Sequence, residues 1–214
     1  MPESSAASDL LRDEPVSLPV SSSTREFAGK VWDIRRESVE VDGTEVVRDF
    51  VDHTGAVAVL ALDEDGRVLL IQQYRHPVRS RDWELPAGLL DMAGEDPLEA
   101  ARRELSEEVD LAASEWNVLS DIMTSPGGSN EVIRVYLARG IVATGTVFER
   151  TEEEAGIVQR WVSLDEAVTA VLERRVQNTI LCVAVLAAHA AREREWSTLG
   201  AERAAWPQRD HVRA

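Results

Sequence analysis

Three carboxylates crowd one short stretch of this chain, Glu104, Glu107 and Glu108 in the segment RRELSEEVDL. Like charges one helical turn apart repel each other by about 0.2–0.5 kcal/mol per pair, so a helix that collects them needs a compensating partner. A hard divalent cation is one such partner, because Mg²⁺ prefers a few carboxylate oxygens together with water and substrate phosphates. The alternative is an ordinary solvated face, and on these residues alone that alternative is the better supported.

The composition explains why a solvated face is credible, and it also excludes several partners. The chain has 39 Asp and Glu against 23 Lys and Arg, a formal net charge of −16. No basic patch assembles easily from that balance, so we expect neither nucleic acid nor an anionic membrane as a partner. The single cysteine, Cys182, excludes an intramolecular disulfide and fits a reducing compartment. With no signal-peptide pattern and no membrane-length apolar run, we expect a soluble, cytoplasmic protein.

The elements that must position the acids are strands and helices in mixed order. Asp-Gly at 42–43 predicts a hairpin within 30–53, and Asp-Gly at 65–66 predicts a second turn of the same kind. The run GAVAVLAL is apolar on both faces and predicts a central strand covered on both sides. Further strands are expected near 82–88, 116–125, 131–140 and 154–164, and helices at 95–109, 163–175 and 177–195. This order predicts an α/β or α+β domain with a mixed sheet between helices.

The helix that carries the acids has recognisable ends and a definite orientation. Asp96 can cap its N-terminus, Pro97 suits the first turn, and Glu99 can reach back as a capping-box partner. At about 100° per residue, one face collects apolar side chains, namely Leu98, Ala101, Leu105 and Val109. The three glutamates lie on an adjacent face, about a quarter turn away. They therefore border the core instead of facing open solvent.

A longer window around the acids, WELPAGLLDMAGEDPLEAARRELSEEVDL, resembles the Nudix hydrolase signature G-x5-E-x7-R-E-U-x-E-E-x-G-U, where U is a bulky aliphatic residue. The matching residues are Gly88, Glu95, Arg103, Glu104, Leu105, Glu107, Glu108 and Leu111. The loop before Glu95 is one residue longer than the signature, and Asp110 replaces its second glycine. That glycine ends the helix, a role Asp can fill because it tolerates the left-handed conformation. The resemblance covers residues 54–190.

The resemblance implies a Nudix fold with a metal site on this helix. Glu104 and Glu108 would be the main ligands of Mg²⁺ or Mn²⁺, Glu107 would assist, and the backbone carbonyl of Ala87 would add an oxygen. An ion pair between the signature's arginine and its first glutamate, Arg103 and Glu95, would clamp the loop to the helix. The family substrate is a nucleoside diphosphate linked to another moiety, which water splits.

The segments YRH, WELPAG and SPGGSNE resemble the ADP-ribose pyrophosphatase branch more closely. That resemblance implies a homodimer in which the hairpin of residues 29–53 supplies swapped strands. Candidate substrate contacts are Arg48, Arg75, Glu84, Ser129 and Glu131, while Asn130 replaces an aspartate of the branch. Without the signature, Arg48 would be interpreted as a surface residue, Arg75 as a turn residue and Glu84 as part of a solvated edge. The expected segments are a disordered 1–23, a dimerisation region 24–53, the Nudix domain 54–196 and a tail 197–214.

The acidic run RTEEEAG before the last strand has two interpretations. A charged loop is usually solvated, but the branch takes its general base from a loop in this region. Alignment on Trp161 puts the base at Glu154, with Glu153 as neighbour candidate and Glu107 as the fallback. The implied reaction is hydrolysis of ADP-ribose to AMP and ribose 5-phosphate. One rival is another nucleoside diphosphate sugar such as GDP-mannose. A non-catalytic ADP-ribose sensor is disfavoured, because every motif acid is present.

Overall fold

The structure is a computed structural model that describes residues 11–145 and 156–213. Its strands are β1 Val20–Ala28, β2 Asp33–Val41, β3 Thr44–Asp52, β4 Ala56–Ala61, β5 Arg67–Arg75, β6 Ser80–Glu84, β7 Ala87–Leu89, β8 Leu111–Met123, β9 Val132–Ala143, β10 Val158–Ser163 and β11 Gly200–Ala201. Its helices are α1 Pro97–Val109, α2 Leu164–Leu172, α3 Thr179–Arg192 and α4 Pro207–Arg213. The expected mixture of strands and helices is confirmed.

The central sheet has the order β11-β8-β9-β4-β7 and is mixed, since β4 runs parallel to β9 and antiparallel to β7. Every residue of β4 is buried. Side chains alternate across a strand, so Ala58 and Leu60 join the core on one face of the sheet, and Val57 and Val59 join the core on the other. The prediction of a central strand covered on both sides is confirmed.

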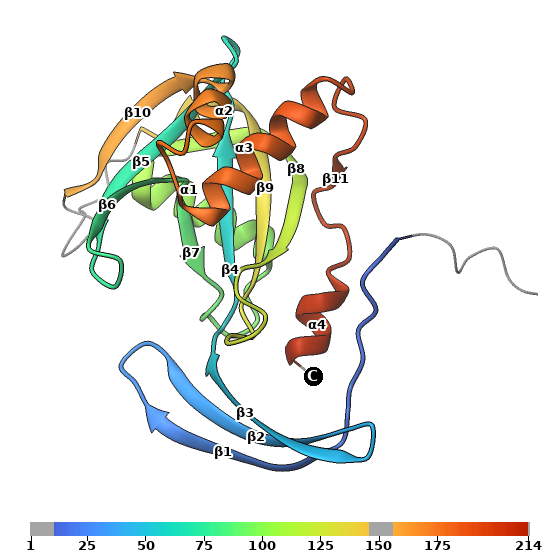
Figure 1. The fold of residues 1–214 in the computed structure, drawn as a ribbon. Helices are drawn as coiled ribbons and strands as arrows, with labels where there is room; N and C mark the ends of the chain where they lie inside the picture. Colours follow the sequence, from blue (N-terminus) through green and yellow to red (C-terminus); the bar gives the residue numbers. More distant parts are fainter. Residues whose placement is uncertain (1–10, 146–155, 214) are drawn as a thin grey trace, which may run out of the picture.

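Helices cover both faces of this sheet, and Figure 1 shows α3 on the near side with α1 behind the strands. Leu181 and Val185 of α3 pack in the first core, whereas Leu98 and Leu105 of α1 pack in the second. Local caps set where two of these helices begin: the side chains of Ser163 and Asn178 accept from backbone N–H groups of the first turns of α2 and α3. The predicted sandwich of a mixed sheet between helices is therefore observed.

The turn at Asp65-Gly66 forms, but the strands on either side of it belong to different sheets. Gly66 has the positive φ of +72° that such a turn needs. Beyond the turn, an isolated β-bridge between Leu62 and Val68 joins the two arms. β5 leaves to lie between β10 and β6 in a second sheet. The sequence pattern suggested a second hairpin, and the correction is that its arms serve two different sheets.

The N-terminal strands form a separate sheet, β1-β2-β3, which Figure 1 shows as a layer below the main body. The turn at Asp42-Gly43 joins β2 to β3 as predicted, with φ of 48° and 76°. β1 adds a third strand to the expected hairpin, and it begins at Val20, inside the segment 1–23 that was expected to be disordered. All of β1 is exposed on this chain.

The C-terminal tail packs onto the domain. β11 pairs with β8, and the side chain of Trp206 is buried in the same core as Leu98. Arg134 is buried, forms a bidentate ion pair with Asp121 and donates to the carbonyls of the tail residues Ala204 and Ala205. The described residues of the segment expected as a C-terminal tail, 197–214, therefore contact the domain. No helix in the described part of the chain is long and apolar enough to cross a bilayer.

Candidate metal and substrate site

Helix α1 is fixed at both ends by short polar contacts. The Asp96 carboxylate accepts from the backbone N–H of Leu98 at 2.9 Å, which is the expected N-cap. Glu99 bonds the side chains of Arg102 and Arg203, and the expected capping-box contact is replaced by these surface pairs. At the other end Asp110 has φ 58° and ψ 33°, the left-handed conformation. Aspartate thus fills the helix-ending role of the signature's glycine.

Two of the three glutamates, Glu104 and Glu108, border the core as predicted. The Glu108 side chain belongs to the buried residues of α1 and Glu104 is nearly buried, at 12% exposure. Glu107 lies further round the helix and is 42% exposed. Desolvation of a carboxylate is costly unless partners compensate it. Glu104 and Glu108 are therefore the two glutamates that need partners within the fold.

Glu104 lies directly over β7, and this contact explains why Gly88 is a glycine. A Cβ atom at position 88 would stand 1.9 Å from Oε1 of Glu104 and 2.0 Å from its Cδ. No side chain fits there unless the carboxylate leaves. The requirement comes from close approach, since the glycines with positive φ lie elsewhere in the chain.

Glu108 is held by the neighbouring residue of β7. Its Oε2 accepts from the backbone N–H of Ala87 at 3.0 Å. Hydrogen bonds from Val59 N–H to the Pro86 carbonyl and from Leu90 N–H to the Gly55 carbonyl define the β4–β7 pairing. Hydrogen-bonded residues alternate along an antiparallel strand, and Ala87 lies next to one of them, so its N–H and its carbonyl both point away from β4. The carbonyl expected to bind metal thus emerges on the same edge as the Glu108 carboxylate.

The predicted clamp between loop and helix is present. Arg103 binds Glu95 through two hydrogen bonds of 2.9 and 3.1 Å, and it also contacts Glu104 and Glu107. The Arg103 guanidinium holds the pKa of Glu95 below its usual value. The hydrogen bond to Glu95 is in turn the largest cause of a raised pKa of Arg103. The positive charge of Arg103 offsets the repulsion between Glu104 and Glu107.

The residues at this edge have the donor atoms that a divalent cation needs. Among residues 11–145 and 156–213, no three His, Cys, Asp or Glu side chains already converge on one point in ligating geometry. Glu104 and Glu108 nevertheless sit one turn apart on α1, both against the edge where the Ala87 carbonyl emerges. All three supply oxygen donors, which Mg²⁺ and Mn²⁺ prefer.

Two of the candidate substrate residues, Arg75 and Glu84, bind each other. The guanidinium donates to both carboxylate oxygens at 2.9 and 2.7 Å, and Gln73 adds a contact at 3.3 Å. The pair lines a cavity of about 290 Å³ that also includes Ala87. This cavity therefore adjoins the edge that carries Glu108.

The other three candidates, Arg48, Ser129 and Glu131, line a different cavity of about 410 Å³. It lies between the N-terminal sheet and the loop that connects β8 to β9. Asn130 ties that loop to the end of β3: its Oδ1 accepts from the backbone N–H of His53 at 2.7 Å, and its Nδ2 donates to Asp52 at 2.9 Å. The amide suits this place because an aspartate there could not donate to Asp52.

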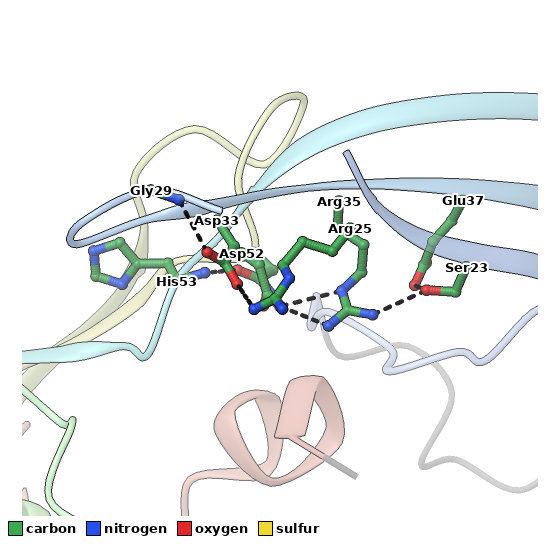
Figure 2. Close-up of polar contacts among 9 residues, drawn as sticks. Ser23, Arg25, Gly29, Asp33, Arg35, Glu37, Asp52 and His53 are labelled. Atoms are coloured by element: carbon green, nitrogen blue, oxygen red, sulfur yellow. Dashed lines mark hydrogen bonds and ion pairs between the residues drawn. The ribbon is translucent and has the colours of Figure 1, made fainter. Parts of the chain in front are cut away.

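Figure 2 shows how this contact continues across the N-terminal sheet. Asp52 also accepts two hydrogen bonds from Arg35, at 3.1 and 3.0 Å, and Arg35 reaches Ser23 on β1. Burial opposes ionisation of Asp52, but the hydrogen bonds from Asn130 and Arg35 hold its pKa below the usual value. The N-terminal sheet and the loop between β8 and β9 are thus joined by one polar network.

Glu131 is fixed from two sides. Its Oε1 lies 2.9 Å from Nε2 of His53, and its Oε2 accepts from the hydroxyl of Thr124. Burial of the carboxyl opposes ionisation, yet these hydrogen bonds outweigh it and hold the pKa of Glu131 below its usual value. The sequence pointed to no role for His53, and it marked Asn130 only as a replacement of an aspartate of the branch.

The proposed base lies outside the described residues, because Glu152, Glu153 and Glu154 fall in 146–155. The third candidate, Glu107, is described and contacts Arg103.

The chain belongs to the NUDIX family, since the NUDIX domain model matches residues 52–181. It is 46% identical over 172 residues to a protein named ADP-ribose pyrophosphatase from Mycobacterium tuberculosis, covering 80% of this chain and 82% of the relative. A relative of the same name from Bacillus subtilis is 36% identical, with 74% and 85% covered. One from Bacillus methanolicus, named methanol dehydrogenase activator, is 34% identical with the same coverage.

A crystal structure described as an ADP compounds hydrolase superposes with a TM-score of 0.69, covering 86% of this chain and 98% of that one. Because the two sequences are only 20% identical, this likeness supports the fold alone.

Proposed function

We propose that this protein is a metal-dependent pyrophosphatase that hydrolyses ADP-ribose to AMP and ribose 5-phosphate. The observation that carries the proposal is the packing of Glu104 and Glu108 against the edge of β7, where Gly88 leaves room for one carboxylate and Ala87 holds the other. The names of the relatives from Mycobacterium tuberculosis and Bacillus subtilis support ADP-ribose as the substrate.

In the proposed reaction, a water oxygen bonds to one phosphorus as the bridging P–O bond of the diphosphate breaks. When bound, Mg²⁺ or Mn²⁺ supplies positive charge that offsets the negative charge of the diphosphate. Glu104, Glu108 and the Ala87 carbonyl would hold that cation, and Arg103 keeps the loop before α1 in place through Glu95. Glu154, with Glu153 as the neighbouring candidate, would take the proton from water.

The substrate contacts divide between two cavities, and this division favours a composite site. The cavity with Arg75 and Glu84 shares no lining residue with the cavity that holds Arg48, Ser129 and Glu131. In a homodimer with swapped N-terminal strands, the second cavity of one protomer would complete the first cavity of its partner.

The exposed N-terminal sheet supports that assembly. Large apolar side chains stand open on this chain, including Val20 at 49%, Phe27 at 62% and Val47 at 51% exposure. Burial of apolar surface drives stable association. Light scattering should give twice the mass of the chain, and a monomeric, fully active protein would contradict the composite site.

The substrate is tested with purified protein, Mg²⁺ and a panel of ADP-ribose, GDP-mannose, ADP-glucose, dinucleotides and deoxynucleoside triphosphates, with the products identified. We expect AMP and ribose 5-phosphate from ADP-ribose at the highest kcat/KM. Glu104→Gln and Glu108→Gln should each lower kcat by orders of magnitude with an unchanged circular dichroism spectrum. Faster cleavage of another nucleotide sugar would change the substrate and keep the class, whereas two active variants would refute the metal site.

A further inference from the structure

His53 is a buried polar residue that the proposed reaction leaves without a role. It follows β3 directly, and its side chain is only 7% exposed. Both ring nitrogens have partners: the backbone N–H of Gly55 lies 2.9 Å from Nδ1, and the Glu131 carboxylate lies 2.9 Å from Nε2. A buried imidazole with two such partners has a defined orientation.

The two contacts also define which nitrogen carries the proton. A ring nitrogen that accepts an N–H hydrogen bond has no proton of its own. Because Nδ1 accepts from Gly55, the neutral imidazole carries its proton on Nε2, and that N–H points at Oε1 of Glu131. The hydrogen bond from His53 to Glu131 therefore has a fixed direction.

The N-terminal sheet holds the imidazole ring in place. Trp32, in the connection between β1 and β2, stacks on His53 with ring centroids 4.1 Å apart and planes inclined by 20°. That connection is tight, because a Cβ atom on Gly29 would stand 1.9 Å from the Trp32 carbonyl oxygen. The Gly29 N–H donates to Asp33 at the start of β2, a contact drawn in Figure 2. Ring, strand and loop are thus packed as one unit.

Glu131 lines the same cavity as Arg48 and Ser129, and its side chain is 21% exposed. An ionised carboxylate offers about four lone-pair positions. His53 and Thr124 take one on each oxygen. The remaining positions can accept hydroxyl groups, which a ribose supplies in pairs.

We infer that His53 is a positioning residue for substrate binding: its Nε2–H fixes the Glu131 carboxylate as an acceptor for sugar hydroxyls, and Trp32 holds the ring that donates it. The inference rests on the proposed function, because it takes a ribose-containing diphosphate as the ligand. It assigns His53 no contact with the reacting atoms. Its loss should therefore weaken binding and leave turnover nearly intact.

Two amide substitutions of His53 separate its two hydrogen bonds. In His53→Gln the terminal amide nitrogen can reach the place of Nε2 and donate to Glu131. In His53→Asn the amide oxygen can replace Nδ1 and accept from Gly55, but the donor to Glu131 is lost. A hydrogen bond to a charged group is worth about 10-fold or more in binding. We expect His53→Asn to raise KM for ADP-ribose by about 10-fold with kcat within about 3-fold, and His53→Gln to restore most of the loss.

A double-substitution cycle shows whether the effect passes through Glu131. In the Glu131→Gln background, His53→Asn should add no further increase in KM, because the group that it positions is gone. Equal KM values for wild type and His53→Asn would overturn the inference. So would an effect of His53→Asn that persists at full size after Glu131→Gln, because the residue would then support the fold in general.

The tautomer gives a readout that does not depend on activity. Nitrogen-15 NMR of the imidazole should show a proton on Nε2 in wild type and an altered Nε2 signal in Glu131→Gln. A proton on Nδ1 would overturn the inference even in an active enzyme. A wild type that does not cleave ADP-ribose refutes the proposed function, and calorimetric Kd values then replace KM in the comparison. A wild type that neither cleaves nor binds ADP-ribose overturns both.

Discussion

Gly88→Ala tests the close approach between β7 and helix α1. The new Cβ would stand 1.9 Å from Oε1 and 2.6 Å from Cγ of Glu104. Ordinary contact needs about 3.5 Å, so the carboxylate must move by about 1.5 Å. A displacement of about 1 Å in a reacting assembly can cost about 10²-fold in rate. We expect kcat/KM for ADP-ribose to fall by about that factor or more, together with weaker activation by Mg²⁺.

The same substitution should leave the fold almost as stable as before. Turning the Glu104 side chain off its rotamer costs about 0.5–1.5 kcal/mol, and replacing a strand glycine by alanine returns about 0.5–1 kcal/mol. The melting temperature should therefore stay within about 4 °C of wild type.

Gly66→Ala is the matched control, because Gly66 has open space around it but a φ of +72°. Alanine in that conformation costs about 1–2 kcal/mol. This variant should melt lower and keep its activity, the opposite of Gly88→Ala. Normal Mg²⁺ activation and near-normal kcat/KM in Gly88→Ala would refute the argument that Glu104 acts from its place over β7.

Three further outcomes are expected. Glu154→Gln should lower kcat by about 10²–10⁴-fold with little change in KM. Glu152→Gln should be nearly silent in the same steady-state assay. If the substitutions of Glu152, Glu153 and Glu154 are all silent, the acidic run is a solvated loop with no role in the reaction. Removing residues 1–53 should give inactive, poorly soluble protein, and an active monomer would rule out the composite site. Arg103 depresses the pKa of Glu95, so the stability from this pair is present above the ordinary glutamate pKa of about 4.3 and lost as pH falls through the lower folded value. Urea unfolding of wild type and Glu95→Gln should therefore differ at pH 7 and converge in acid, and a constant difference would contradict the assignment.

The sequence by itself determined the parts of this protein that depend on local pattern. Helix α1 lies where its periodicity predicts, with Asp96 and Asp110 at its ends and with Glu104 and Glu108 at the border of the core. The central strand β4 could be predicted equally well, because a strand that is apolar on both faces has to be covered on both sides. These features arise within a few neighbouring residues, where spacing and side-chain type decide the outcome.

Only the tertiary structure decided which distant groups meet. The arms of the turn at 65–66 separate into two sheets because β10 and β9, far along the chain, supply the pairing partners. The His53 ring contacts Glu131, and the Asn130 side chain accepts from the His53 backbone N–H across a separation of 77 residues. Such contacts leave no periodicity in the sequence. They depend on packing of complete sheets and loops, which brings particular polar atoms to hydrogen-bonding distance.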